Sequence, residues 1–478
     1  MQLKITKPRA MRIVPNENIC FPIGTIAAVI NFFQMLELED VFRKHKTKGR
    51  DLSSLVEALV SYKLTENLSI SKASDWTNRP PVRDIFDLKS FEDKTLYRAL
   101  DILGANREEI MYDILDCLFT KFDFEHTDVN IDWSSLILWG EKAKLGKRGY
   151  SRDHRPDKKQ ITFGVAELSS PINIPIGLTV QPGNMHDSEH FLHTFDQVKN
   201  WLKPGSRIIM DKGAYSKGNL DYIRFHSMRF LTAKKLNKSH DERIKEFDKS
   251  KAELVDEKDG IYGIKIEWPS KTDYFYFSEK LEQDQLKSKI RKAERFFLQA
   301  KDMQNIIDNN KKLPKRYKIN NPLVDAKIVI QTKLTELTDE EAMEFAKKGA
   351  INGREGFFCL TSSDNLTLEE ALKTYRMKDS VEKIMNSLKN EIEIKPVRVW
   401  SDNAIYGALI IGFLAQLFVS VIRYMHKELK HTSTKFIRNS LSNLTVTVEY
   451  LPKDRKRFIY ANFDSINGVI LNRECAKT

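Results

Sequence analysis

Three acidic residues that lie far apart along the chain have the character of metal ligands. Asp132 falls in the β-rich run VNIDWSS, Asp211 ends the apolar run RIIMD before a Lys-Gly turn, and Glu382 follows the apolar run GFFCLTSS. Carboxylate oxygens bind Mg²⁺ or Mn²⁺, with water and substrate phosphates completing the shell. Two such ions can activate an attacking oxygen and stabilise a leaving oxygen at a phosphodiester. Any one of these acids alone is more often a turn or cap residue.

The segment around Glu382, YRMKDSVEKIMNSLK (375–389), is predicted to form one helix. At 3.6 residues per turn, its polar residues Tyr375, Lys378, Glu382 and Lys389 share a narrow face. A second arc is apolar and can pack on a core; it contains Met377, Val381, Ile384, Met385 and Leu388. A carboxylate flanked by cations suits an acid that holds a metal beside bound phosphate. An ordinary surface helix with intrahelical ion pairs is the alternative.

The elements that would position these acids are strands and helices in alternation. Strands are expected at 128–138, 160–168, 172–183 and 207–213, and a helix at 188–202. Residues from about 240 to 350 look like an insertion, with a long charged helix and strands at 262–268, 273–280 and 324–332. Acids at strand ends suit such a core, because open α/β sheets bind ligands there.

Both ends of the chain are predicted to be largely helical. Residues 22–120 carry apolar residues at helical spacing with short polar breaks, and the part after about 397 does so too. Short helices in a basic protein fit a helix-turn-helix-like module, with 95–103 as the candidate recognition helix. Helical packing without DNA contact fits the same pattern equally well.

The composition indicates a folded, basic protein. The 478 residues suffice for about three domains, and the net charge of +12 with a pI of about 9.2 indicates an anionic partner. Nucleic acid leads, and a membrane surface is the alternative. Four scattered cysteines and no visible signal peptide predict a cytoplasmic location. The longest apolar run, 404–422, approaches a membrane span in length, but it contains Gln416 and Ser420 and is expected to be a buried helix.

Several further patterns bear on binding. The segments 140–160 and 234–238 are rich in Lys and Arg, so each either tracks a DNA backbone or is a solvated loop. His186, His190 and His193 have the spacing of a zinc face on a helix, a weaker hypothesis. No phosphate-binding GxxxxGK[ST] loop and no GxSxG elbow occurs.

The order and spacing of the motifs resemble the DDE transposases of the insertion-sequence-four type, which are RNase H-like recombinases. The resemblance covers about residues 127–425. It rests on IDWSS, on GYSRDHRPDKKQITFGVAE followed by IPIGLTVQPGNMHDS, and on IIMDKGAYSKGNL. Its fourth element is Tyr-x2-Lys-x3-Glu-x6-Lys, which is similar to that group's Tyr-x2-Arg-x3-Glu-x6-Lys signature.

The resemblance implies a site and an activity. The catalytic metal ligands would be Asp132, Asp211 and Glu382, holding two Mg²⁺ or Mn²⁺ ions, and the residues that bind DNA phosphate would be Tyr375, Lys378 and Lys389. The activity would be metal-dependent cleavage at the ends of an element, followed by strand transfer into target DNA. The partners would be terminal inverted repeats, target DNA and a second copy of the chain in a synaptic homodimer, with no membrane. The protein would be nucleoid-associated when bound to DNA.

The expected fold is α/β, with an RNase H-like catalytic core that contains a β-containing insertion and is flanked by helical N- and C-terminal regions. The regions are a helical DNA-binding part (1–125), the first part of the core (126–240), the insertion (241–350), the second part of the core with the signature helix (351–396) and a helical C-terminal region (397–478).

Three positions qualify the resemblance. Lys378 stands where the signature has arginine; it keeps the charge but loses the two-pronged fork for phosphate. Ser134 satisfies the usual Ser or Thr two residues after the first acid, which favours Asp132 over Asp128. Asp187, in GNMHDS, is a candidate for positioning the site. A metal-dependent nuclease of the same fold and a catalytically silent DNA-binding relative are the alternative functions.

Overall fold

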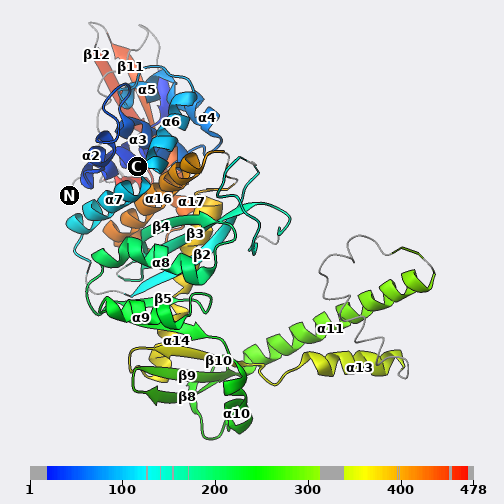
Figure 1. Cartoon of the computed structure of the whole chain (residues 1–478). Helices are drawn as coiled ribbons and strands as arrows, with labels where there is room; N and C mark the ends of the chain where they lie inside the picture. The colour runs from blue at the N-terminus through cyan, green and yellow to red at the C-terminus, as the bar shows by residue number, and fades with distance from the viewer. Residues whose placement is uncertain are drawn as a thin grey trace. The chain divides into compact units, whose positions relative to one another are not determined.

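The computed structural model describes residues 19–124, 128–139, 142–152, 155–170, 172–309, 311–312, 338–395, 397, 399–451 and 455–471. The chain forms two compact units (Figure 1). The first contains the chain up to Phe230 and again from Tyr375 onward, and the second is Leu231–Thr374. All six residues predicted to act in the site therefore belong to the first unit.

A bundle of helices builds the N-terminal part of the first unit. Its helices are α1 (Gly24–Met35), α2 (Leu38–Arg43), α3 (Leu52–Leu64), α4 (Ile70–Thr77), α5 (Pro80–Ile85), α6 (Lys94–Ala105) and α7 (Arg107–Lys121). The long helix α16 (Asp402–Met425) returns from late in the chain and packs against α3 and α6. It is long and apolar enough to cross a membrane, but 89% of its most apolar window is buried within the protein. It is thus the expected buried helix.

Two glycines allow α6 and α16 to approach each other closely. A Cβ atom on Gly104 would lie 1.9 Å from the carbonyl oxygen of Asn403, and one on Gly407 would lie 2.1 Å from that of Leu100. Neither position has room for a side chain, because the obstructing atoms are backbone. The candidate recognition helix, 95–103, therefore lies within a helix that is committed to this contact, although Arg98 remains exposed.

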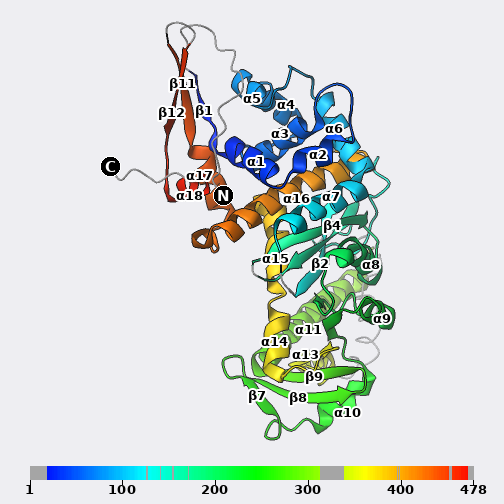
Figure 2. The same ribbon diagram turned by 90° about the vertical axis from the view of Figure 1, so that its left-hand side faces the viewer.

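The sheet of the first unit contains β2 (Val129–Ile137), β3 (Gln160–Leu168), β4 (Ile174–Pro182) and β5 (Arg207–Met210), in the order β4-β3-β2-β5. β3 is antiparallel to β2 and β4, whereas β5 is parallel to β2. Helix α8 (Asp187–Val198), followed by the turn η1 (Lys199–Trp201), and helix α15 (Asp379–Asn386) lie on opposite sides of β2 (Figure 2). Helix α9 (Lys217–Phe225) follows β5.

The second unit is built on a largely antiparallel sheet. Its strands follow the order β6-β10-β9-β8-β7, with bounds Arg229–Lys234 (β6), Glu253–Asp256 (β7), Ile261–Trp268 (β8), Lys271–Ser278 (β9) and Phe357–Ser362 (β10). The unit boundary falls within β6 and within α14 (Leu368–Arg376). Its described residues also form the helices α10 (Lys238–Glu246), α11 (Glu279–Asp308) and α13 (Asp339–Ala350).

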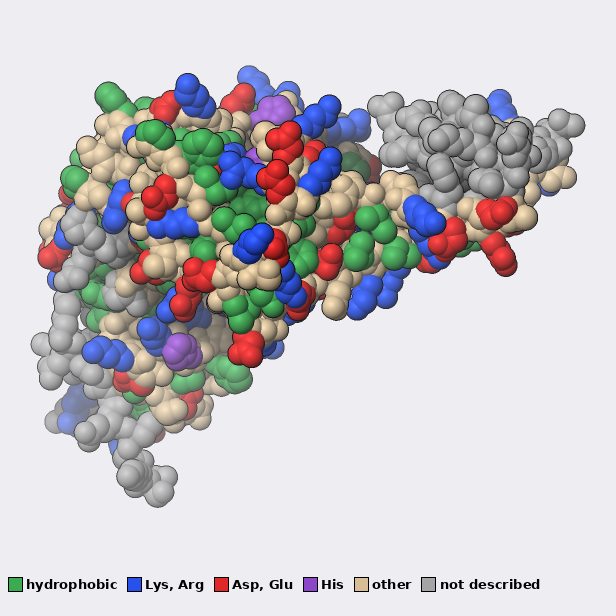
Figure 3. Space-filling model, turned by 90° about the horizontal axis from the view of Figure 1, so that it is seen from below, with side chains coloured by type: hydrophobic (Ala, Val, Ile, Leu, Met, Phe, Trp, Pro, Cys, Tyr) green, Lys and Arg blue, Asp and Glu red, His purple; other side chains and the backbone are tan. Residues whose placement is uncertain are grey.

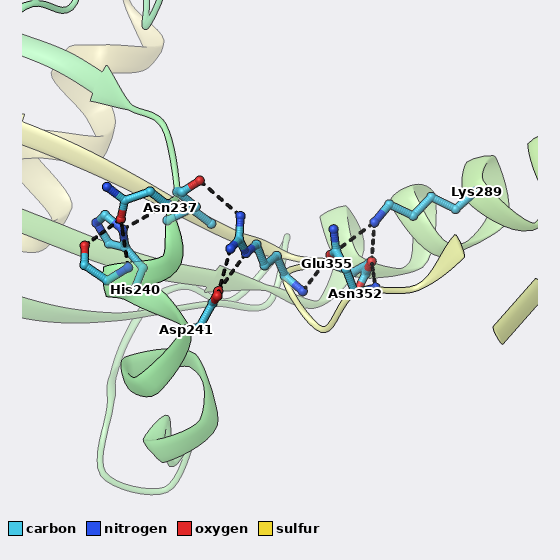
Figure 4. Close-up of polar contacts among 9 residues, drawn as sticks. Asn237, His240, Asp241, Lys289, Asn352 and Glu355 are labelled. Atoms are coloured by element: carbon cyan, nitrogen blue, oxygen red, sulfur yellow. Dashed lines mark hydrogen bonds and ion pairs between the residues drawn. The ribbon is translucent and has the colours of Figure 1, made fainter. Parts of the chain in front are cut away.

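The turn before β10 is tied to two helices of the second unit (Figure 4). Arg354 donates two hydrogen bonds, of 2.7 and 2.8 Å, to the carboxylate of Asp241 in α10. Lys289 of α11 binds Glu355, whose carboxylate is buried. Asn237 and His240 form a capping box at the start of α10. These charge-assisted contacts fix the path of the chain into β10.

The C-terminal region differs from its predicted helical character. It contains α17 (Thr434–Asn443), α18 (Ser465–Ile470) and the turn η4 (Lys427–Leu429), but also a hairpin of β11 (Thr445–Leu451) and β12 (Arg455–Ala461). β11 also pairs with β1 (Ile19–Pro22), which makes a three-stranded sheet from the two ends of the chain. TVTVEYL alternates with period two, the pattern of a strand, and this pattern outweighs the helical neighbours.

The compact units also group the residues differently from the five predicted regions. The second unit begins before residue 241 and includes β10, which the sequence pattern assigns to the second part of the core. β10 pairs with β9 along six residues, so its hydrogen bonds tie it to the insertion sheet. The strand predicted at 324–332 lies outside the described residues.

Candidate active site

Asp132 and Asp211 are brought together by the register of two parallel strands. Ile131 pairs with Met210 between β2 and β5, so the residues that follow, Asp132 and Asp211, are neighbours. β5 ends at Met210, whereas β2 continues to Ile137. Asp211 is therefore at a strand end as predicted, but Asp132 is in the middle of its strand, at the level where its shorter neighbour stops.

Helix α15 carries Glu382 to the same place. Its apolar side, formed by Val381, Ile384 and Met385, is buried, whereas the side chain of Glu382 is 60% exposed. Residues 130 and 132 point to the same side of β2 because side chains alternate along a strand, and α15 lies on that side. The opposite side of β2 presents Trp133, whose indole N–H donates to Thr194 of α8.

A buried polar network fixes α15 on the sheet. Ser380 donates a hydrogen bond of 2.8 Å to Glu167 on β3 and accepts one of 3.0 Å from the amide of Asn130 on β2. Burial raises the pKa of Glu167 to about 8. Ser380 is two residues before Glu382, so the network sets where the third acid is held. Nothing in the sequence motif pointed to Glu167 or Asn130, because their role depends on cross-strand pairing.

Lys378 links two of the three acids. Its ammonium is 3.2 Å from Asp132 Oδ2 and 3.2 Å from Glu382 Oε1, and the lysine side chain is only 8% exposed. Burial lowers the pKa of Lys378, but the charges of Asp132, Glu382 and Asp211 outweigh this effect and raise it overall. The lysine thus stays charged at the centre of the acid cluster.

Tyr375 faces the remaining acid. Its hydroxyl is 3.5 Å from Asp211 Oδ1, a long contact. Burial raises the pKa of Tyr375, and the charge of Asp211 adds to the effect, so the phenol keeps its proton. The hydroxyl can therefore donate to an anion that enters the site.

The prediction of one continuous helix from 375 to 389 is wrong, because the structure divides this segment into three pieces. Helix α14 ends at Arg376, α15 begins at Asp379, and a π-helical turn, η3 (Ser387–Glu391), follows. The π-turn is closed by the amide of Ile392, which donates to the carbonyl of Ser387. This turn is wider than an α-helical one, and Leu388 and Ile392 are both buried there. Met377, expected to pack on the core, falls in the break and is 45% exposed.

Lys389 lies in the π-helical turn. Its ammonium is 5.9 Å from the centre of the Phe163 ring on β3. Phe163 and Val165 alternate onto one side of β3, and Val165 pairs with Asp132, so Lys389 is on the same side of the sheet as that acid. Its phosphate-binding role stays a prediction.

A second group of charges approaches the acids from the other direction. Arg152 lies 4.0 Å from Asp132 and 3.5 Å from Asp187, measured from its guanidinium nitrogens to carboxylate oxygens. Asp187 is the first residue of α8. Burial raises the pKa of Asp187, the charge of Arg152 opposes this, and Asp132 and Asp211 add to it. Arg152 was not singled out in the sequence, although it lies in the basic segment 140–160.

Of the three histidines of the zinc hypothesis, His190 serves structure instead. His190 is buried, and its ring nitrogens lie 3.3 Å from the hydroxyl of Thr162 and 2.9 Å from that of Thr179. Burial lowers the pKa of His190 to about 3, so the ring is neutral. Among the described residues, these histidines form no metal-binding group.

Asp128 has a different role from Asp132. It forms an ion pair with Arg207 at 3.0 Å, at the start of β5, whereas the acids meet where that strand ends. The position of Asp128 is thus apart from Asp211, and the pairing with Arg207 accounts for its charge.

The donor set fits a divalent metal ion. Asp132, Asp211 and Glu382 supply hard carboxylate oxygens, and both oxygens of Asp132 already face cationic groups, Lys378 and Arg152. Three carboxylates that converge on one place gather negative charge, and that charge attracts both these side chains and an added cation. The residues present therefore suit the ion that the sequence predicts.

Comparison with known proteins identifies the family. Residues 124–418 match the model of the transposase DDE domain, which is more than half of the chain, so this protein belongs to that family of transposases. The curated proteins contain no matching sequence. Among solved structures, the chain is similar to a piggyBac transposase seen by cryo-EM in a synaptic complex with hairpin DNA. The identity is 11%, with 88% of this chain and 77% of the other covered, and the TM-score is 0.42. These values are too low to transfer any property.

Proposed function

We propose that this chain is a DNA transposase of the insertion-sequence-four type that cuts the ends of its element and joins them to target DNA. The observation that carries the proposal is the convergence of Asp132, Asp211 and Glu382 on one side of the sheet, with Lys378 bridging two of them. Asp132, Asp211 and Glu382 would hold two Mg²⁺ or Mn²⁺ ions. When bound, such ions activate the attacking oxygen and stabilise the leaving oxygen.

The chain's own residues would orient the DNA strand. Lys378 is charged and buried beside the acids. It would attract the scissile phosphate as a single point charge, without the two-pronged contact of an arginine. Tyr375 would donate a hydrogen bond from its hydroxyl to a phosphate oxygen, and Lys389 would hold the strand farther along. Surface charge alone does not mark the DNA path: on the face shown in Figure 3, Lys and Arg side chains alternate with Asp and Glu.

The test uses the full chain and DNA that carries the inverted repeats flanking its reading frame. With Mg²⁺, the wild type should cut at the repeat ends and transfer the freed 3′-hydroxyl end into a second DNA. Asp132→Ala, Asp211→Ala and Glu382→Ala should each abolish cutting but leave DNA binding measurable. Untouched cleavage in all three variants would reject the catalytic assignment.

The same experiment separates the alternatives. Cutting without strand transfer would identify a nuclease of the same fold, and specific binding without cutting would identify a silent relative. A pair of repeat ends bridged by two protein copies, measured by light scattering, would support the proposed synaptic homodimer; one copy on each isolated end would contradict it.

A further inference from the structure

Arg152 joins the acid site to the start of α8. Its guanidinium is 4.0 Å from Asp132 Oδ1 and 3.5 Å from Asp187 Oδ2. Both separations are those of ion pairs and exceed the length of a charge-assisted hydrogen bond, about 2.7–2.9 Å. A guanidinium has five N–H donors, so this side chain keeps the capacity to bind an incoming anion.

The backbone around Arg152 is held in place. The amide of Arg152 donates to Ser135 Oγ at 3.1 Å, and Ser135 is buried on β2 three residues beyond Asp132. The buried side chain of Gln160 donates to the carbonyl of Tyr150 at 2.7 Å. The loop is therefore fastened to β2 and β3 and presents the arginine at a defined place.

Asp187 is equally constrained. A Cβ atom on Gly213, two residues after Asp211, would lie 2.5 Å from Asp187 Oδ2. The carboxylate of Asp187 thus rests on the turn that follows the second acid, and a larger residue at 213 would displace it. Asp187 holds the guanidinium of Arg152 from α8, a helix that carries none of the three acids.

A cavity opens beside this pair. Its volume is about 400 Å³, and its lining includes Ser134, Tyr150, Arg152 and Asp187. The side chain of Arg152 is 31% exposed, so part of the guanidinium is accessible. Ser134 is two residues from Asp132, which places the cavity next to the first acid and gives a DNA backbone room to enter.

We propose that Arg152 binds the phosphate at the scissile bond, and that Asp187 is the positioning residue that holds its guanidinium. This inference rests on the proposed function. It also explains how the chain tolerates lysine at 378. Lys378 approaches Asp132 Oδ2 and lacks a fork, whereas Arg152 approaches Oδ1 of the same carboxylate and supplies one. The two-pronged contact to phosphate would thus come from Arg152, on the Oδ1 side of Asp132, and not from residue 378 on the Oδ2 side.

The test compares Arg152→Ala, Arg152→Lys, Asp187→Asn and the double variant Arg152→Lys/Lys378→Arg. The matched control is Arg224→Ala, because Arg224 is also 31% exposed and pairs with an aspartate, Asp221, away from the site. Single-turnover cleavage, the salt dependence of DNA binding and the unfolding temperature are measured for each.

Arg152→Ala should lower the cleavage rate about 100-fold or more, as loss of a preorganised donor does. It should also reduce the salt slope of DNA binding by about one, while Arg224→Ala leaves both unchanged. Arg152→Lys should cleave at least about tenfold more slowly than the wild type. Adding Lys378→Arg should recover part of the rate, because a guanidinium that can bind phosphate with two hydrogen bonds is again present beside Asp132. Asp187→Asn should slow cleavage without lowering the unfolding temperature by more than a few degrees.

Wild-type cleavage and an unchanged salt slope in Arg152→Ala would overturn the inference. So would a fully active Arg152→Lys, since charge alone would then suffice. If Arg152→Ala does not fold, the cleavage rates of Arg152→Lys and of the double variant decide whether the inference holds. If the wild type itself does not cut, the proposed function fails, and the salt slope still tests whether Arg152 meets phosphate.

Discussion

The side chain of Ser380 on the acid-bearing helix donates to the buried carboxyl of Glu167 on β3, at 2.8 Å. Glu167 lies directly opposite Asn130 in the register of β2 and β3, and Asn130 donates to the same serine. The third acid of the site is thus positioned by a residue that takes no part in the chemistry. This relationship ties the protonation of one core carboxyl to the placement of Glu382.

Glu167→Gln should flatten the pH dependence of stability. The folded chain keeps a proton on Glu167 up to a pKa of about 8, whereas the ordinary value is 4.5. Between these values the folded state binds more protons, so the free energy of unfolding falls as pH rises from about 4.5 to 8. Above pH 8 the variant should exceed the wild type by a few kcal/mol, and near pH 4 the two should agree. Urea unfolding at both pH values measures this.

The control for that experiment is the exposed Glu108, whose side chain is 90% accessible. Glu108→Gln should follow the wild-type curve at every pH. An equal pH dependence in Glu167→Gln and the wild type would show that Glu167 is not protonated in the folded chain.

Asp132→Ala should destabilise the protein by about 2 to 3 kcal/mol, because it removes a partner of the buried Lys378. Lys378 keeps its ion pair with Glu382 in this variant, which limits the loss of stability. Adding Lys378→Met should recover most of the stability while cleavage stays absent. Chemical unfolding of both variants is the measurement, and strictly additive losses would contradict the coupling.

Tyr375→Phe keeps the ring and removes the hydroxyl that faces Asp211. The long contact contributes little to folding, so the free energy of unfolding should change by less than about 1 kcal/mol. The cleavage rate should fall about tenfold if the hydroxyl binds phosphate. A single-turnover rate equal to that of the wild type would remove Tyr375 from the set of phosphate ligands.

Gly407→Ala should destabilise the protein by about 3 kcal/mol or more, because the new methyl would meet the backbone of α6 at 2.1 Å. Gly218→Ala is the matched control: it is also helical, on α9, and a Cβ there has no atom within 4 Å. That change should be neutral or stabilising by up to about 1 kcal/mol. Thermal unfolding compares the two, and equal effects would argue against the close helix contact.

The strands that carry Asp132 and Asp211 were predicted from their β-rich runs, and the helix that carries Glu382 from the apolar spacing of 381–388, but the meeting of the three acids was expected only from the family resemblance. The break at Met377–Lys378 was not predictable from that period, because the apolar spacing continues across it while α14 ends at Arg376 and α15 begins at Asp379. The π-helical turn at 387–391 likewise goes with the burial of Leu388 and Ile392. Local pattern carries no information about either.

Tertiary contacts between distant segments account for the other differences. Arg152 reaches the acids through a loop held by Ser135 and Gln160, and no spacing in the sequence encodes that approach. The pairing of β1 with β11 joins residues more than 400 positions apart. By contrast, the burial of α16 followed from its composition, and the strand at 160–168 from its alternating pattern; the strand predicted at 207–213 is present but ends at Met210.

Helix α16 has a consequence for how such a protein could be recombined. The family match begins at residue 124, yet α16 lies at its end and is covered by α3 and α6 from outside the match, with Phe32 of α1 against its Phe418. A fragment trimmed to the match would expose this apolar surface to water. The N-terminal helical bundle therefore cannot be exchanged as a module between transposases unless the residues of α16 that face it are exchanged as well.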